Sequence, residues 1–186
     1  AMRALGDRVL AMLALSLELD EHYFRPMYDW PITTLRLIKY PPHPLQAENN
    51  QIGAGAHTDW GGITLLAQDD SGGLEVQNVA GQWLQAPALP EAFVVNLGDL
   101  MARWTNGLYN SNRHRVKNNK SGRDRYSVPF FYSPRPDARI ACLPGCSSAA
   151  SASGAEGSRR RMLKIVPTEP QMSRLEEPSS GSNSTQ

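Results

Sequence analysis

Residues 63–85 read ITLLAQDDSGGLEVQNVAGQWLQ. Short runs of apolar and β-branched residues alternate here with Gly-containing turns, a pattern typical of consecutive antiparallel strands. We expect strands at 63–68, 74–78 and 82–85. Strands this short, joined by turns this tight, favour a sandwich or jelly roll over an alternating α/β fold.

The same pattern continues on both sides of this stretch. Further strands are expected at 33–40, 55–59, 92–96, 113–116 and 126–132. Upstream, apolar residues at helical spacing predict a helix over 3–19, and Asp20 is a candidate cap for a second short helix at 21–24. A helical turn is expected at 99–104. We therefore predict a mainly β fold, a double-stranded β-helix (jelly roll) preceded by N-terminal helices.

Composition bounds the classes of protein that this chain can represent. It has 186 residues, 40% hydrophobic and 20% charged, which is enough for one domain with a buried core. A net charge of +1 argues against a protein built mainly to bind nucleic acid or an anionic membrane. No apolar run approaches the roughly 20 residues of a membrane span, and two cysteines cannot form a disulfide framework. We expect a soluble, cytoplasmic protein and favour a monomer.

The two ends of the chain differ from its middle. Residues 146–186 are rich in serine and poor in large apolar residues, which predicts a disordered tail. The N-terminal helical pattern begins with no preceding cap or turn. We therefore expect upstream sequence to be missing, as in a fragment or a truncated gene product.

The segment His57-Thr58-Asp59 suggests a metal site. Alternate side chains of a strand share a face, so His57 and Asp59 would project together as two ligands. His114 is the best third ligand, because its strand would have an apolar inner face and a basic outer face. The opposing interpretation is that His57 and Asp59 form a hydrogen bond in a turn.

Two histidines and one carboxylate form the facial triad of non-heme Fe(II) oxygenases, which leaves three coordination positions open. A structural zinc site would instead need four ligands, typically including cysteine. Cys142 and Cys146 lie far downstream, so the sequence favours the open triad.

A second candidate site is Arg125-Tyr126-Ser127, where Arg125 and Ser127 would share one strand face. An inward arginine needs an anionic partner, and a guanidinium beside a hydroxyl suits a carboxylate. No carboxylate of the chain is obviously reserved for it, so we expect an anionic ligand. The opposing interpretation is an exposed arginine on a basic surface.

These residues belong to a longer series of motifs. The series comprises RLIKYPP at 36–42, HTDWGGITLL at 57–66, GLEVQ at 73–77, VNLGD at 95–99, WTNG at 104–107, SNRHRV at 111–116 and RYS at 125–127. On these motifs, residues 35–144 resemble the catalytic domain of the Fe(II)- and 2-oxoglutarate-dependent dioxygenase superfamily. The resemblance is greatest to the isopenicillin N synthase-like branch.

The resemblance implies site residues. The implied iron ligands are His57, Asp59 and His114. Arg125 and Ser127 match the pair that holds the far carboxylate of 2-oxoglutarate. Tyr40 matches the tyrosine of the family's Asn-x-Tyr motif, which also approaches this co-substrate, although Ile38 stands at the Asn position.

The resemblance also implies an activity and an organisation. With Fe(II) and O2, the protein would convert 2-oxoglutarate to succinate and CO2 while hydroxylating, desaturating or cyclising a small organic substrate. No nucleic acid or membrane is expected as a partner. The implied regions are N-terminal helices packing on the barrel at 1–30, a jelly-roll oxygenase domain at 31–145 and the tail at 146–186.

Three alternatives stay open. Relatives resembling isopenicillin N synthase and amino-cyclopropane oxidase keep the triad and the Arg-x-Ser pair without using 2-oxoglutarate. A chain without the family's N-terminal region and C-terminal helices would be an inactive truncated fragment. A nucleic-acid module is the third, because six cations lie close together: Arg113, Arg115, Lys117, Lys120, Arg123 and Arg125.

Overall fold

The computed structural model describes residues 1–44, 52–147 and 166–167. The tail predicted at 146–186 lies outside the described residues, apart from 146–147 and 166–167. Within the described part, strands outnumber helices and pair into two antiparallel sheets. The prediction of a mainly β fold is therefore confirmed.

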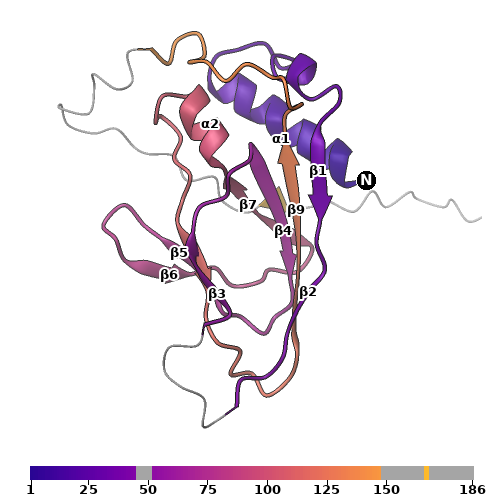
Figure 1. Cartoon of the computed structure of the whole chain (residues 1–186), viewed down its shortest axis with the longest axis vertical. Helices are drawn as coiled ribbons and strands as arrows, with labels where there is room; N and C mark the ends of the chain where they lie inside the picture. The colour runs from indigo at the N-terminus through magenta and orange to yellow at the C-terminus, as the bar shows by residue number, and fades with distance from the viewer. Residues whose placement is uncertain (45–51, 148–165, 168–186) are drawn as a thin grey trace, which may run out of the picture.

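Each sheet joins strands that are distant in the sequence (Figure 1). The larger sheet has the order β1 (Ile32–Leu35), β9 (Arg125–Ser133), β4 (Ile63–Gln68), β7 (Ala92–Leu97) and β10 (Val166–Pro167), and β2 (Ile38–Tyr40) also pairs with β9. The smaller sheet has the order β3 (Ala54–His57), β8 (His114–Val116), β5 (Leu74–Gln77) and β6 (Trp83–Gln85). Pairing of such distant segments brings motifs from the whole chain to one place.

The strand predicted at 33–40 is two strands, and the break lies opposite Pro129 of β9. Both β1 and β2 pair with β9 in one continuous register. The Arg36 N–H donates to the Pro129 C=O at 3.0 Å, but proline has no N–H to donate in return. The missing ladder bond explains why the predicted single strand is interrupted here.

Two other predicted boundaries were wrong. The strand predicted at 55–59 ends at His57, because the Asp59 carbonyl accepts a hydrogen bond from the Asp99 N–H, at 2.8 Å, in a turn. The helix predicted at 21–24 is a series of turns, followed by the 3₁₀ helix η1 (Arg25–Met27), which has a proline in its first turn. Asp20 does cap these turns, since its Oδ1 accepts the His22 N–H at 2.8 Å.

The helices α1 (Met2–Ser16) and α2 (Asp99–Trp104) pack together at one end of the sheets (Figure 1). Leu13 of α1 and Trp104 of α2 are almost fully buried in the same core as the strands. Gly6 lies so close to β9 that an added Cβ would be 2.6 Å from the Tyr132 ring. Helix α1 is thus part of the main hydrophobic core.

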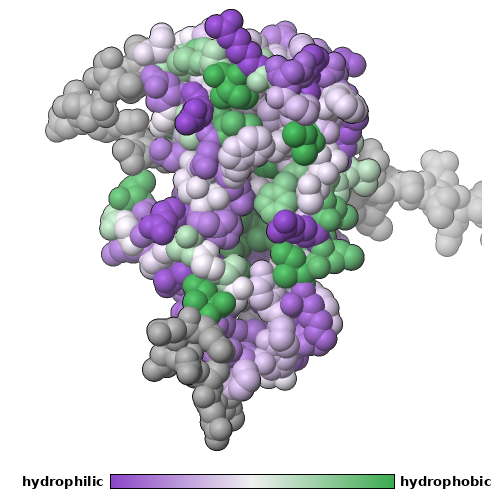
Figure 2. Space-filling model, viewed as in Figure 1, coloured by the Kyte–Doolittle hydropathy of each residue, from purple (hydrophilic) through white to green (hydrophobic). Residues whose placement is uncertain are grey.

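Hydrophobic residues gather at the surface along β1 and its connection to β2 (Figure 2). Leu35 and Leu37 are 55% and 81% exposed, and all of β1 is exposed. Within the described residues, β1 is the edge strand of the larger sheet, which accounts for this exposure. No helix in the described ranges combines the length and apolar character needed to cross a membrane.

Candidate metal centre

The facing sides of the two sheets enclose a cavity of about 310 Å³. Strands of both sheets contribute alternate residues to it, as the pleat of a strand requires. On β9 the contributing residues are Arg125, Ser127, Pro129 and Phe131. The other lining side chains are apolar and polar in about equal number, and the polar groups define what the cavity can bind.

Three potential metal ligands converge at this cavity. His57 ends β3, His114 begins β8, and Asp59 lies in the turn after β3. One ligand atom from each residue lies within 4.8 Å of the other two. The Nε2 atoms of His57 and His114 are 3.9 and 3.7 Å from Oδ1 of Asp59. The structure therefore brings together the three residues singled out in the sequence.

The two imidazoles are held in the same tautomer. Nδ1 of His57 lies 2.6 Å from the Gly55 carbonyl, and Nδ1 of His114 lies 3.1 Å from the Asn112 carbonyl. A carbonyl oxygen only accepts hydrogen bonds, so each Nδ1 must carry the proton. Nε2 is then the ring nitrogen that is available to a metal, and in both residues it faces Asp59.

Asp59 is a buried carboxylate whose two oxygens have different surroundings. Oδ2 accepts hydrogen bonds from Thr64 Oγ1 at 2.6 Å and from Asn96 Nδ2 at 2.7 Å. Oδ1 faces the Nε2 atoms of the two histidines. A buried carboxylate oxygen beside two imidazole nitrogens supplies the donor types that bind a divalent cation. The donor set therefore fits a divalent metal ion.

The sequence did not single out Thr64 and Asn96 as site residues. They face each other in the β4–β7 pair, and both line the cavity. The available signal was a single amide in the otherwise apolar strand AFVVNL. Its partner strand is far away in sequence, so the contact with Asp59 depends on the tertiary structure.

A tight turn fixes the backbone of Asp59. The Gly98 N–H donates to the Gly62 carbonyl at 2.9 Å. An added Cβ on Gly98 would lie only 2.0 Å from the Gly61 carbonyl oxygen and 3.0 Å from that of Asp59. Glycine is therefore required where the start of α2 meets this turn.

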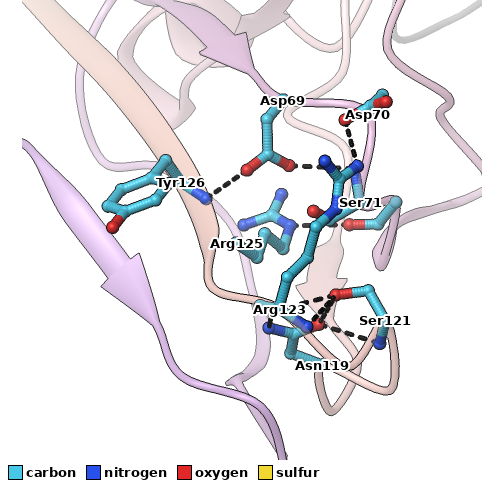
Figure 3. Close-up of polar contacts among 9 residues, drawn as sticks. Asp69, Asp70, Ser71, Asn119, Ser121, Arg123, Arg125 and Tyr126 are labelled. Atoms are coloured by element: carbon cyan, nitrogen blue, oxygen red, sulfur yellow. Dashed lines mark hydrogen bonds and ion pairs between the residues drawn. The ribbon is translucent and has the colours of Figure 1, made fainter.

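Arg125 lies at another part of the cavity wall, beside the loop 69–73 (Figure 3). Its Nε donates to the Gly72 carbonyl at 2.6 Å, and its Nη2 donates to Gln68 Oε1 at 3.1 Å. The predicted alternation on β9 is confirmed, because Arg125 and Ser127 are 1% and 4% exposed while Tyr126 is 51% exposed. The alternative of an exposed arginine is therefore wrong.

One donor of Arg125 is left free. Its buried Nη1 has no hydrogen-bond partner among the described residues. Burial lowers the pKa of this guanidinium, and the charge of nearby Asp69 and the hydroxyl of Tyr40 only partly oppose that effect. The Tyr40 ring lies 4.9 Å from the guanidinium carbon. A buried guanidinium with a free donor is suited to bind the carboxylate of a ligand.

Asp69 anchors the loop that supports Arg125. Its carboxylate accepts hydrogen bonds from the backbone N–H groups of Ser71 and Tyr126 (Figure 3). Burial raises the pKa of Asp69, but these two hydrogen bonds and the Arg125 charge outweigh it and hold the pKa below its usual value. The ionised Asp69 carboxylate therefore holds the loop in place and helps to fix the position of the Arg125 guanidinium.

Several cations of the run at 113–125 have partners within the protein. Arg115 and Lys117 both form ion pairs with the buried carboxylate of Glu75. Arg123 pairs with Asp70, and Arg125 lines the cavity. Three of the six cations thus have a carboxylate partner, and a fourth, Arg125, is buried.

The sequence model of the 2OG-Fe(II) oxygenase superfamily matches residues 31–134. The chain belongs to this superfamily. The match includes both sheets up to the end of β9, and with them the candidate metal ligands and Arg125.

Curated relatives carry names of the same oxygenase class. The chain is 49% identical over 151 residues to the 2-oxoglutarate-Fe(II) type oxidoreductase hxnY of Emericella nidulans, an alignment covering 80% of this chain and 43% of the relative. It is 37% identical over 158 residues to a 1-aminocyclopropane-1-carboxylate oxidase of Dictyostelium mucoroides, covering 70% and 43%. The chain therefore spans less than half the length of these two relatives.

Solved structures of 2OG-Fe(II) oxygenases share the fold. A full-length Neurospora crassa protein in complex with alpha-KG matches with a TM-score of 0.76 at 36% identity, over 83% of this chain and 50% of that one. A putative 2OG-Fe(II) oxygenase family protein from Caulobacter crescentus matches with a TM-score of 0.72 at 35% identity, over 89% and 52%. The predicted double-stranded β-helix is thereby confirmed.

Proposed function

We propose that this chain forms the catalytic core of an Fe(II)- and 2-oxoglutarate-dependent dioxygenase that acts on a small organic substrate. The observation that carries the proposal is the presence of His57, Asp59 and His114 in one cavity with the Arg125 guanidinium. The first group offers a metal triad and the second a carboxylate clamp. Together they suit a ligand that chelates the metal at one end and carries a carboxylate at the other.

The proposed ligands of Fe(II) are His57, Asp59 and His114. Two imidazole nitrogens and one carboxylate are the donors of the facial triad, which leaves positions for a co-substrate and dioxygen. Iron, 2-oxoglutarate and O2 together would supply the oxidative decarboxylation to succinate and CO2 and the oxidation of a substrate C–H bond. Asp59 would offset part of the metal charge.

The other polar residues orient the co-substrate in this proposal. Arg125 would bind the far carboxylate through its free Nη1, and Ser127 would donate from the same face of β9. Tyr40 covers the guanidinium from β2 and limits its access to water. Apolar walls, including Leu66 and Val94, would exclude water from the space beside the metal.

A second candidate function is an iron oxidase that does not consume 2-oxoglutarate. The 37% identity to a 1-aminocyclopropane-1-carboxylate oxidase favours it. Arg125 would then bind a carboxylate of another molecule. We also propose that the chain belongs to the isopenicillin N synthase-like branch of the superfamily and that it acts in the cytoplasm. Activity of this chain by itself is likewise a proposal, because the chain spans less than half the length of these two relatives.

Calorimetric titration with Mn(II), as an unreactive substitute for Fe(II), followed by 2-oxoglutarate tests the proposal. We expect one Mn(II) per chain and 2-oxoglutarate binding that depends on the metal. His114→Ala should abolish Mn(II) binding, whereas Arg125→Gln should retain it and weaken 2-oxoglutarate binding about tenfold or more. His22→Ala and Arg123→Gln are matched controls outside the cavity.

Oxygen uptake with Fe(II) separates the two functions. Uptake that requires 2-oxoglutarate and yields succinate supports the dioxygenase. Uptake that is indifferent to 2-oxoglutarate would favour the second function, and uptake in neither case would identify an inactive fragment. A chain that binds no Mn(II) would refute the metal site itself.

A further inference from the structure

Gln68, the last residue of β4, connects the two sheets beside Arg125. Its Nε2 donates a hydrogen bond to the Ala86 carbonyl at 2.8 Å, and its Oε1 accepts one from Arg125 Nη2 at 3.1 Å. Ala86 follows β6, and its N–H donates to the Leu74 carbonyl at 3.0 Å, which extends the β5–β6 pair of the smaller sheet. Arg125 belongs to the larger sheet. A single side-chain amide therefore joins the smaller sheet to the cavity arginine.

The two hydrogen bonds fix the orientation of the Gln68 amide. The Ala86 carbonyl oxygen can only accept a hydrogen bond, so it must face the NH2 group. The amide oxygen is then the atom that faces Arg125, whose guanidinium can only donate. Gln68 also pairs with Ser127 across the β4–β9 ladder, so the two side chains share the face of the sheet that borders the cavity.

The hydrogen bonds that the described residues offer to the Arg125 side chain come from neutral oxygens. Nη2 donates to Gln68 and Nε donates to the Gly72 carbonyl at 2.6 Å, which fixes the plane of the guanidinium and leaves Nη1 free. Arg115 and Arg123, in contrast, each have a carboxylate partner. Because Arg125 is 1% exposed, water screens its charge little. The guanidinium is thus held in place by groups that leave its positive charge available for an anion.

The identity of residue 68 matters for this charge. The carboxylate of Asp69, whose charge acts on Arg125, already accepts the backbone N–H groups of Ser71 and Tyr126. A glutamate in place of Gln68 would put a further carboxylate within hydrogen-bond distance of the guanidinium. It would form an internal ion pair, and a ligand carboxylate would have to compete with it. The neutral amide therefore suits a site that binds an anion.

We propose that Gln68 is a positioning residue that orients the Arg125 guanidinium and keeps its charge free. It thereby gives the cavity its preference for a 2-oxo acid with a second carboxylate. The inference rests on the proposed function, because that function assigns Arg125 to the far carboxylate of 2-oxoglutarate. Gln68 acts through Arg125 and is not itself one of the residues that line the cavity. Its effect should appear in binding of the co-substrate and not in binding of the metal.

The test compares 2-oxoglutarate with 2-oxopentanoate, which has the same chain length but a methyl group in place of the far carboxylate. Titration calorimetry on the Mn(II)-loaded chain measures both affinities. Gln68→Glu keeps the size of the side chain and an acceptor oxygen but adds one negative charge. It should weaken 2-oxoglutarate binding about tenfold or more, while the affinities for 2-oxopentanoate and Mn(II) stay within about twofold of wild type.

Gln68→Met is the second variant, because it removes both hydrogen bonds without adding a charge. It should weaken 2-oxoglutarate binding about three- to tenfold, which is less than the effect of Gln68→Glu. The matched control is Gln82→Glu, because Gln82 is exposed and its Oε1 also accepts a side-chain hydrogen bond, from Asn78. Wild-type affinity for 2-oxoglutarate in either Gln68 variant, or an equal loss for both 2-oxo acids in Gln68→Met, would overturn the proposal. Failure of the wild-type chain to bind Mn(II), or to prefer 2-oxoglutarate, would instead refute the proposed function.

Discussion

His57 and His114 lie directly opposite each other in the β3–β8 pair, with their ring centroids 4.3 Å apart. Each ring donates its Nδ1 proton to the carbonyl of the residue two positions earlier. The pairing of two distant strands therefore sets both the spacing and the tautomer of the imidazoles. Asp59 completes the group from the turn that follows β3.

The hydrogen bonds to Asp59 should control metal affinity. Thr64→Val removes one of the two donors to Oδ2 while nearly preserving the shape of the side chain. We expect Mn(II) affinity to fall about 10–100-fold, as is typical when a group that orients a ligand is lost. Titration calorimetry measures the change. Thr33→Val on exposed β1 is the matched control, and equal affinities of the two variants would contradict the prediction.

Gly98 should not tolerate alanine. The added Cβ would overlap the Gly61 carbonyl oxygen, and backbone on both sides of the contact would have to separate. We expect Gly98→Ala to lower the free energy of unfolding by about 3 kcal/mol and to weaken Mn(II) binding, because Asp59 shares this turn. Urea unfolding and metal titration measure the two effects. Gly55→Ala, whose Cβ would meet no atom within 4 Å, should change stability far less.

Helix α1 should contribute to the stability of the whole domain. Leu13 is 1% exposed, and its replacement by alanine should cost about 2–5 kcal/mol of unfolding free energy. Leu15→Ala on the same helix is the control, because Leu15 is 58% exposed. Similar unfolding curves for the two variants would mean that α1 does not fold with the sheets.

Glu75 should make stability depend on pH. The Glu75 carboxylate forms ion pairs with Arg115 Nη2 at 2.7 Å and with Lys117 Nζ at 3.1 Å. Burial raises its pKa, but the bonds to the two cations outweigh burial and hold the pKa below the usual value of 4.5. The pKa of Glu75 is lower in the folded state than its ordinary value of 4.5. The stabilisation is therefore complete above pH 4.5 and is lost as the pH falls through the folded-state pKa.

Glu75→Gln should therefore reduce stability by about 1–3 kcal/mol at pH 7, where the wild-type carboxylate is ionised. The difference from wild type should shrink as the pH falls below 4.5. Urea unfolding at a series of pH values measures this convergence. The control is Glu18→Gln at an exposed position, and a constant difference between Glu75→Gln and wild type would exclude the role assigned to Glu75.

Local sequence was sufficient to predict most strands, because the pleat imposes a period of two and glycine marks the turns. It was also sufficient to select His57, Asp59, His114 and Arg125, because few residues of these types stand in apolar strands. The break opposite Pro129 and the end of β3 were missed. Both depend on which strand or turn provides the hydrogen-bond partner, and that partner is distant in the sequence.

The sequence by itself determined the mainly β architecture, the candidate ligands and the superfamily, since these follow from residue types at fixed spacings. Only the tertiary structure decided how those residues are used. It placed Thr64 and Asn96 on Asp59, left Nη1 of Arg125 free, and brought Gln68 between Arg125 and Ala86. The physical reason is that side-chain hydrogen bonds and ion pairs act over a few ångströms, and folding decides which distant residues come within that range.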